Sequence, residues 1–264
     1  MKTSVVPTAP EELRELIRRG EFSNNTAGLA PGYLQTNIAI LPRELAFDFL
    51  LFCQRTPKPC PLIEVLDPGS YTPKESAPRA DLRSDVPKYR VYENGELTNE
   101  ITDISSYWRS DLVTFLLGCS FTFETAMMNT GISLRHIEAR SNIPMFITNI
   151  ETVPAGIFSG PMVVSMRPIP EDQIVRTIQV TSRFPSVHGA PIHIGEPEAI
   201  GIKDITRPDL GDAVEIKNAE VPIFWACGVT PQSVAMNSKP PLMITHSPGH
   251  MFITDRRDEE FSVI

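Results

Sequence analysis

"PMVVSMRPIPEDQIVRTIQVTSRFPSVHGAPIHIG", residues 161–195, decides the fold class. Its apolar start is typical of a buried strand, and Pro170 suits the first turn of the helix that is predicted to follow. The end of the stretch indicates a further strand, with Ile192 and Ile194 on one face and His193 on the other. Strand, helix and strand in this order predict a compact β-α-β unit.

A second stretch, residues 221–255, repeats this order. Its first strand ends at Cys227-Gly228, and Thr230 is placed to cap a helix whose first residue is Pro231. Such alternation favours an α/β protein. Strands of this second unit are expected at 221–226, 242–245 and 250–254.

We therefore expect two α/β subdomains, a larger layered domain with a mixed sheet and a smaller α/β insertion. The larger domain would comprise residues 1–150 plus 220–264, and the insertion residues 151–219. The 25 prolines are spread along the chain, which favours many short elements and rigid turns over long helices.

The remaining elements follow from local signals. Thr8 and Glu11 form a capping box for a helix that Gly20 would end, and Asn94-Gly95 predicts a hairpin between alternating strands. We expect Asp111 to cap a helix that runs to Leu117, and a second helix at 121–131.

Composition excludes several classes of function. The net charge is −8 and no Lys/Arg-rich run is present, so nucleic acid is a poor partner. No apolar run is long enough for a membrane span, and the first twenty residues lack the apolar core of a signal peptide. The four cysteines form no CxxC pair, which predicts reduced thiols in a cytoplasmic protein.

Two strand-to-helix junctions are candidate sites. Cys119 and Ser120 precede a predicted helix, where free amides and the helix dipole can stabilise an anion or a thiolate, and Glu124 lies one turn on. Cys227 and Thr230 occupy the same position at the second junction. Each junction could instead be a structural turn with a buried thiol.

Histidines and arginines supply further candidates. His188, His246 and His250 lie in Gly/Pro turns at predicted strand ends, where binding and catalytic residues often occur. Arg83, Arg90 and Arg167 are candidate clamps for a carboxylate, although Arg90 fits a surface ion pair better. We find neither a spacing specific to a metal site nor a nucleotide or cofactor motif, so no metal or cofactor is predicted.

Several blocks resemble the D-glutamate cyclase family of hydro-lyases from end to end. They are "AGLAPGYLQTNIAILP", "DLRSDVPKYRV", "FLLGCSFTFE", "HGAPIHIG", "GDAVEIKNAEVPIFWACGVTPQ" and "ITHSPGH". The resemblance implies a two-subdomain α/β architecture and loss of water from D-glutamate to give 5-oxo-D-proline. It implies a small-molecule carboxylate as substrate and supplies no catalytic residues.

Such a cyclisation needs a base, an acid, an anion-stabilising pocket and a carboxylate clamp. We assign His188 or His250 as acid and base, with Glu124 as the second proton carrier. Amides near Cys119-Ser120 would stabilise the oxyanion. Arg83 or Arg135 would bind the α-carboxylate, with Cys227, Thr230 and His246 as further binding residues.

Other readings stay open at this point. The same groups suit a protein that binds a small carboxylate without turning it over, a metal-dependent hydrolase, or a thiol-dependent enzyme using Cys119 or Cys227. A homodimer is suggested only by the general frequency of twofold oligomers.

Overall fold

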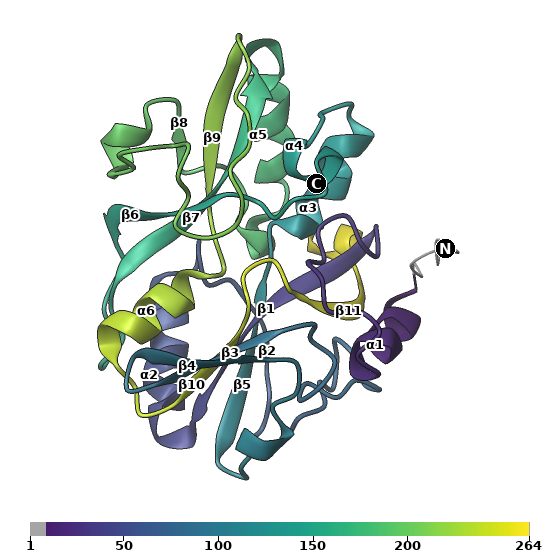
Figure 1. Ribbon diagram of the computed structural model, residues 1–264, viewed down its shortest axis with the longest axis vertical. Coiled ribbons are helices and arrows are strands. Elements are labelled where there is room, and N and C mark those ends of the chain that lie inside the picture. The colour runs from purple at the N-terminus through teal and green to yellow at the C-terminus, as the bar shows by residue number, and fades with distance from the viewer. Residues whose placement is uncertain (1–8, 264) are drawn as a thin grey trace.

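The computed structural model describes residues 9–263 and contains two lobes, each built around one sheet (Figure 1). A seven-stranded sheet organises the large-sheet lobe and a four-stranded sheet the small-sheet lobe. Helices cover the sheets, so the predicted α/β class is confirmed. Within residues 9–263 no helix is both long and apolar enough to cross a membrane.

The large sheet is built around β1 (Tyr33–Pro42). Nine of its ten residues are buried, because both faces of the strand are covered. Ile38 and Ile40 pack into one apolar core, whereas Ala39 and Leu41 pack into the core on the opposite face. The strand order is β2-β5-β1-β10-β3-β4, with β11 also paired to β1. The other strands are β2 (Leu62–Val65), β3 (Tyr89–Glu93), β4 (Glu96–Ile101), β5 (Leu112–Gly118), β10 (Met243–His246) and β11 (Phe252–Arg257).

The prediction of a helix at 111–117 is wrong, because residues 112–118 form strand β5. It pairs antiparallel with β1 over seven residues, from Thr36 opposite Gly118 to Pro42 opposite Leu112. Every residue of β5 is buried, so the apolar run reflects a strand covered on both faces. Asp111 pairs with Arg109 instead of capping a helix.

The hairpin around Asn94-Gly95 is confirmed as β3 and β4. Both turn residues have positive φ, 52° and 84°, as a two-residue hairpin turn requires. A β-bulge between Val91 and Tyr92 then shifts the register by one residue, so that Arg90 lies opposite Glu100.

The small sheet has the order β6-β7-β9-β8, and all its pairings are antiparallel. Its strands are β6 (Met145–Glu151), β7 (Pro161–Pro170), β8 (His193–Ile194) and β9 (Glu220–Ala226). Strands β7 and β8 run in the same direction but are separated by β9, and α5 (Ile174–Ser182) connects them. The predicted strand–helix–strand order is therefore present, although the strands are not neighbours.

The second predicted unit is not compact, since its strands belong to different sheets. After β9 the chain forms α6 (Thr230–Ser238) and enters the large sheet as β10. The domain division at 151 and 219 stays a prediction; the strands of the small sheet come from residues 145–226.

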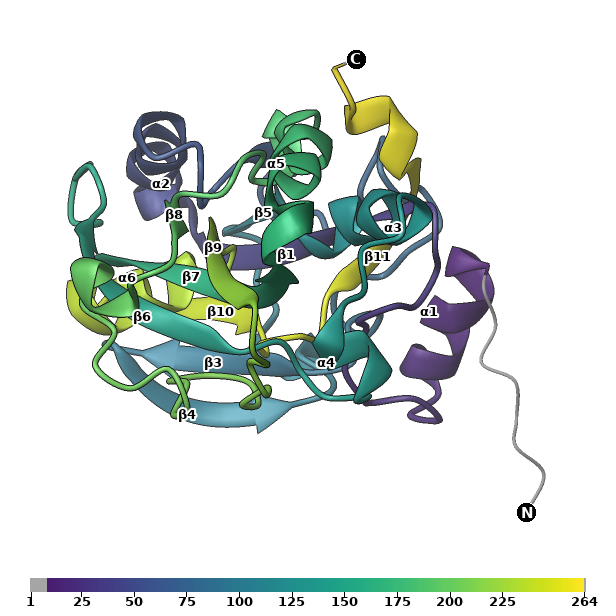
Figure 2. The ribbon, with the colours of Figure 1, turned by 90° about the horizontal axis from the view of Figure 1, so that it is seen from above.

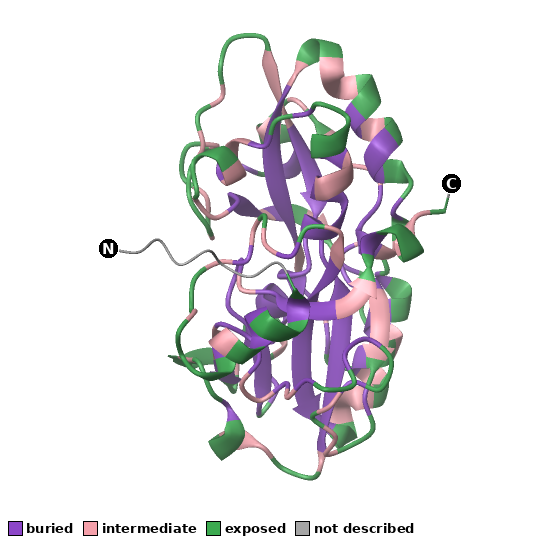
Figure 3. Cartoon of the chain, turned by 90° about the vertical axis from the view of Figure 1, so that its right-hand side faces the viewer, coloured by how far each residue is buried: buried purple, intermediate pink, exposed green. Residues whose placement is uncertain are grey.

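The remaining helices are α1 (Pro10–Arg18), α2 (Arg43–Arg55), α3 (Phe121–Asn129) and α4 (Arg135–Glu138). Pro10 is at the start of α1 and Gly20 has positive φ beyond its end, as predicted, while Thr8 lies outside the described residues. Seen from above, α2 and α5 lie on one side of the molecule and the β3–β4 hairpin on the other (Figure 2). Buried residues follow the strands of both lobes, whereas the helices turn exposed residues outward (Figure 3).

Candidate functional site

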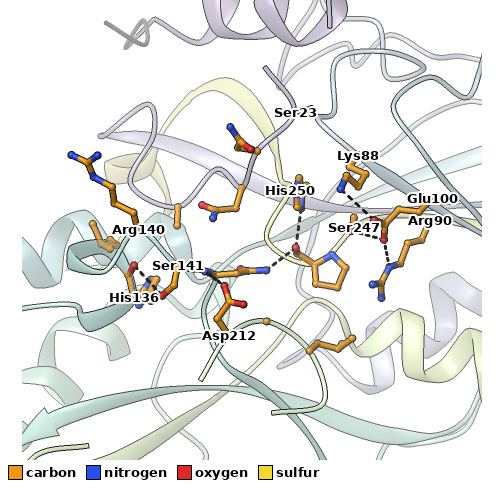
Figure 4. A pocket seen from close by; sticks show the side chains of 18 of the residues that line it. Ser23, Lys88, Arg90, Glu100, His136, Arg140, Ser141, Asp212, Ser247 and His250 are labelled. Atoms are coloured by element: carbon orange, nitrogen blue, oxygen red, sulfur yellow. Dashed lines mark hydrogen bonds and ion pairs between the residues drawn. The ribbon is translucent and has the colours of Figure 1, made fainter. Parts of the chain in front are cut away.

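A cleft of about 750 Å³ lies between the two lobes. From the large-sheet lobe it is lined by the loop after α1, by Lys88 and Arg90, by Glu100, and by the Ser247–His250 turn. The small-sheet lobe contributes α4 with the residues that follow it, and the 209–212 loop. Polar and charged side chains line most of it (Figure 4).

Two of the cations in the cleft are held by one carboxylate. Arg90 Nε lies 2.9 Å and Lys88 Nζ 3.3 Å from the Glu100 carboxylate, and the Ser247 hydroxyl donates to it at 3.1 Å. Burial raises the pKa of Glu100, but Arg90, Lys88 and Ser247 outweigh it and lower that pKa. The ion pair expected for Arg90 is therefore present, and Glu100 is ionised at neutral pH.

Arg140 is the cation of the cleft whose charge is not neutralised locally. Within residues 9–263, its guanidinium forms neither an ion pair nor a hydrogen bond. Nearby, one carboxylate oxygen of Asp212 accepts the backbone N–H of Asn142 at 2.8 Å, and Asn142 donates to the carbonyl of Pro248 at 2.9 Å. The cleft therefore offers a free guanidinium for a carboxylate and a carboxylate for an ammonium group.

His250 supplies a neutral imidazole to the cleft. Its pKa is lowered chiefly by burial, against the opposing effect of the Pro248 and Ser23 carbonyls. Nδ1 lies 2.9 Å from the carbonyl oxygen of Pro248, which can only accept a hydrogen bond. The Pro248 carbonyl therefore favours the tautomer with the proton on Nδ1, which leaves on Nε2 the lone pair that a general base requires.

His136 connects the cleft to a buried group of polar residues. It lines the cleft, yet its side chain is only 2% exposed, and its Nε2 lies 3.1 Å from Oε1 of Glu124. The distance is that of an ion pair, but the N–H direction is not aligned for a hydrogen bond. Hydrogen bonds in active sites are often poorly aligned until substrate binds, and a small rotation of the ring would align this one.

The buried group is centred on Arg167 of β7, whose side chain is 1% exposed. Nε donates to Glu124 Oε1 at 2.9 Å, and the same oxygen also accepts from the terminal nitrogen. Ser120 and Ser165 accept from the guanidinium at 3.0 and 3.2 Å. Burial raises the pKa of Glu124, but His136 and Arg167 outweigh it and lower that pKa, so Glu124 is a carboxylate.

The two predicted strand-to-helix junctions meet beside Arg167. Cys119 and Cys227 belong to one apolar cluster, and both are free and buried. Burial raises the pKa of the Cys119 thiol strongly and that of Cys227 to about 11. Both thiols are therefore protonated at neutral pH, which is unfavourable for the thiolate chemistry considered for Cys119.

Other predicted residues lie away from the cleft lining. Arg83 pairs with Asp81 at 2.7 Å and Arg135 with Glu220 at 2.6 Å. His188 is buried with Nδ1 2.8 Å from the Lys58 carbonyl, and burial lowers its pKa to about 4.

His246 and Thr230 serve the backbone. Burial lowers the pKa of His246 to about 3, and its Nδ1 accepts the Ile38 N–H at 3.2 Å. Thr230 is the first residue of α6 and not its cap; its hydroxyl donates to the Cys227 carbonyl at 2.7 Å. Ser120 likewise makes no capping bond to α3.

Sequence reasoning did not select Lys88, Glu100, His136, Arg140 or Asp212. These residues come from three distant parts of the chain. Lys88 and Glu100 lie at the β3–β4 hairpin, His136 and Arg140 in or just after α4, and Asp212 in the 209–212 loop. Within residues 9–263, no three His, Cys, Asp or Glu side chains are grouped so that they could hold a metal ion.

Comparisons with known proteins identify close relatives. A family model described as D-glutamate cyclase matches residues 113–255. A protein of Bacillus licheniformis named "Putative hydro-lyase" is 66% identical over 255 residues, 97% of either chain. A protein of the same description from Geobacillus kaustophilus is 63% identical over 262 residues, 99% of this chain and all of the relative. A nitrogen repressor-like protein of Methanococcus jannaschii is 10% identical, and the match covers 94% of this chain and 98% of that protein. Its TM-score of 0.38 is too low to establish a shared fold.

Proposed function

This chain belongs to the D-glutamate cyclase family of lyases, and from that premise we propose that it converts D-glutamate into 5-oxo-D-proline and water in the cleft between its lobes. One observation carries the proposal. The cleft combines the neutral imidazole of His250 with the free guanidinium of Arg140. A base and a carboxylate receptor in one polar cleft are the two components that the cyclisation needs first.

The reaction moves two protons from nitrogen to oxygen. The α-ammonium group becomes an amide N–H and loses two protons, while one γ-carboxylate oxygen gains two protons and departs as water. The N–C bond forms as the C–O bond breaks, so charge and atoms balance without a co-reactant. The site therefore needs a group that removes protons from nitrogen and one that delivers them to oxygen.

We assign His250 Nε2 as the base and retain Glu124 as part of the second proton-carrying pair. Glu124 is ionised and buried, so the proton would be exchanged at His136, which lines the cleft. Arg140 replaces the predicted Arg83 and Arg135 as the clamp for the α-carboxylate, because neither of those lines the cleft. Lys88 and Arg90 would stabilise the negative charge on the γ-carboxylate.

Binding in the cleft would also supply part of the rate. An extended glutamate must fold back before its amine can reach its own γ-carbon. Arg140 on one lobe and Lys88 with Arg90 on the other would bind the two carboxylates and so hold the substrate in the conformer that reacts.

The test is incubation of the purified protein with D- or L-glutamate, following loss of primary amine and gain of 5-oxoproline. We expect product from the D-isomer, with turnover reduced about 100-fold or more in H250Q. The matched control is H193Q, since His193 bonds to the Glu196 carbonyl outside the cleft. Saturable D-glutamate binding without product would favour a carboxylate-binding protein instead.

A further inference from the structure

We propose that Glu124 and Arg167 are positioning residues that hold the imidazole of His136 with Nε2 toward the interior and Nδ1 toward the cleft. The kinetic tests of this inference rest on the proposed function, whereas the measurement of the His136 tautomer does not. It adds to the proton exchange proposed at His136 a positioning role for the buried Glu124–Arg167 ion pair.

Arg167 fixes the carboxylate of Glu124 from the interior. Its guanidinium places two nitrogens on the same oxygen, Oε1, and its remaining contacts are with two serine hydroxyls. The guanidinium carbon also lies 5.3 Å from the centre of the Phe123 ring and 5.1 Å from that of Trp225. A planar cation held by hydrogen bonds and two rings has little rotational freedom, so the carboxylate that it binds is also fixed.

Glu124 in turn faces one nitrogen of His136. Its Oε1 lies 3.1 Å from Nε2, and both side chains are only 2% exposed. A carboxylate can only accept a hydrogen bond, so it favours the proton on Nε2. Phe121 restrains the ring further, with its centre 6.2 Å from that of His136 and the planes 19° apart.

The consequence concerns the nitrogen that remains. His136 lines the cleft, and its Nε2 lies 3.1 Å from Glu124 Oε1, so Nδ1 is the atom available for proton exchange there. A carboxylate behind an imidazole both selects the tautomer and stabilises the ring when it takes up a second proton. Removing the carboxylate should therefore lower kcat more than it raises KM.

The first measurement uses the unmodified protein. The ¹⁵N shifts of the His136 ring report which nitrogen carries the proton, and we expect Nε2–H in the neutral form. A neutral ring protonated at Nδ1 would overturn the proposal, whether or not the protein cyclises glutamate.

The second measurement compares E124Q with E138Q. Both replace a glutamate by its amide, but Glu138 is exposed on α4 and its carboxylate lies 4.0 Å from Arg135. We expect E124Q to lower kcat about 10- to 100-fold with KM changed little, and to mix the two ring tautomers of His136. E138Q should change neither quantity. An unchanged kcat and tautomer in folded E124Q would refute the role of Glu124.

R167K separates positioning from charge. Lysine keeps the positive charge but lacks the planar fork that holds Oε1. We expect an intermediate loss of kcat and a partly mixed tautomer, with far-UV circular dichroism confirming the fold. Full wild-type behaviour of R167K would show that charge alone suffices and would overturn the positioning role of Arg167.

Discussion

Arg167→Met tests the buried ion pair directly, because it removes the guanidinium and keeps an apolar side chain of similar length. The expected loss of stability follows from the burial of the Arg167–Glu124 pair. Arg167 and Glu124 are 1% and 2% exposed, so water cannot replace the missing cation. Removing one partner of such a pair leaves an uncompensated buried charge and costs about 3–5 kcal/mol.

Urea unfolding followed by circular dichroism measures this loss. With an m-value of about 3 kcal/mol/M, the midpoint should fall by about 1–1.7 M. R256M is the control, because the Arg256–Glu260 pair is exposed and should be worth only about 0.3–0.5 kcal/mol. The double variant E124Q/R167M should lose less than the sum of the single losses. A loss below about 1 kcal/mol in R167M would refute the reasoning.

Three further predictions concern the cleft and the core. Because the pKa of His250 is lowered, its neutral, basic form persists below pH 6.5. The rate of cyclisation should therefore fall as the pH is lowered, with a midpoint below pH 6.5. This acid-side decrease in rate should change in H250Q but not in H193Q. In steady-state kinetics, R140A should raise KM for D-glutamate about 10- to 100-fold with kcat less affected. The control R19A, which breaks an exposed ion pair with Glu15, should leave both constants unchanged. The pKa of His188 is about 4 in the folded state, below its unfolded value of 6.5. Its contribution to the free energy of unfolding is therefore complete above pH 6.5. That contribution is lost as the pH falls from 6.5 to 4, at about 1.4 kcal/mol per pH unit. Urea midpoints measured across this range should fall less steeply in H188N than in the wild type.

Fold class and several elements were predictable because local chemistry agrees with the final structure. Asn94-Gly95 forms its hairpin, and Pro10 begins its helix. Residues 112–118 show the limit of such reasoning. A short apolar run suits either a buried helix or a buried strand, and the pairing with β1, distant in sequence, decides for the strand.

In the candidate site, too, some residues could be predicted from local sequence and others could not. Cys119, Ser120 and Cys227 were selected by their positions at strand ends, and Glu124 by its place one turn into the following helix. The fold brings them together around Arg167. The pairing of Arg90 with Glu100 was harder to predict, because a regular two-residue hairpin would place Arg90 opposite Asn99. The bulge between Val91 and Tyr92 shifts Glu100 into that position.

His136 and Arg140 had no local signal of function. They lie on or just after a helix of four residues, and their importance follows from its place beside the cleft. That place depends on how the two lobes pack, which no single stretch of sequence specifies.

The central claim is that the cleft removes water from D-glutamate, and isotope labelling tests it most directly. D-Glutamate carrying ¹⁸O in both γ-carboxylate oxygens is incubated with the protein, and the product is analysed by chiral chromatography and mass spectrometry. We predict 5-oxo-D-proline that retains one labelled oxygen, with the other released as labelled water, and almost none of this product with H250Q. Unchanged D-glutamate after prolonged incubation with folded wild-type protein would contradict the claim.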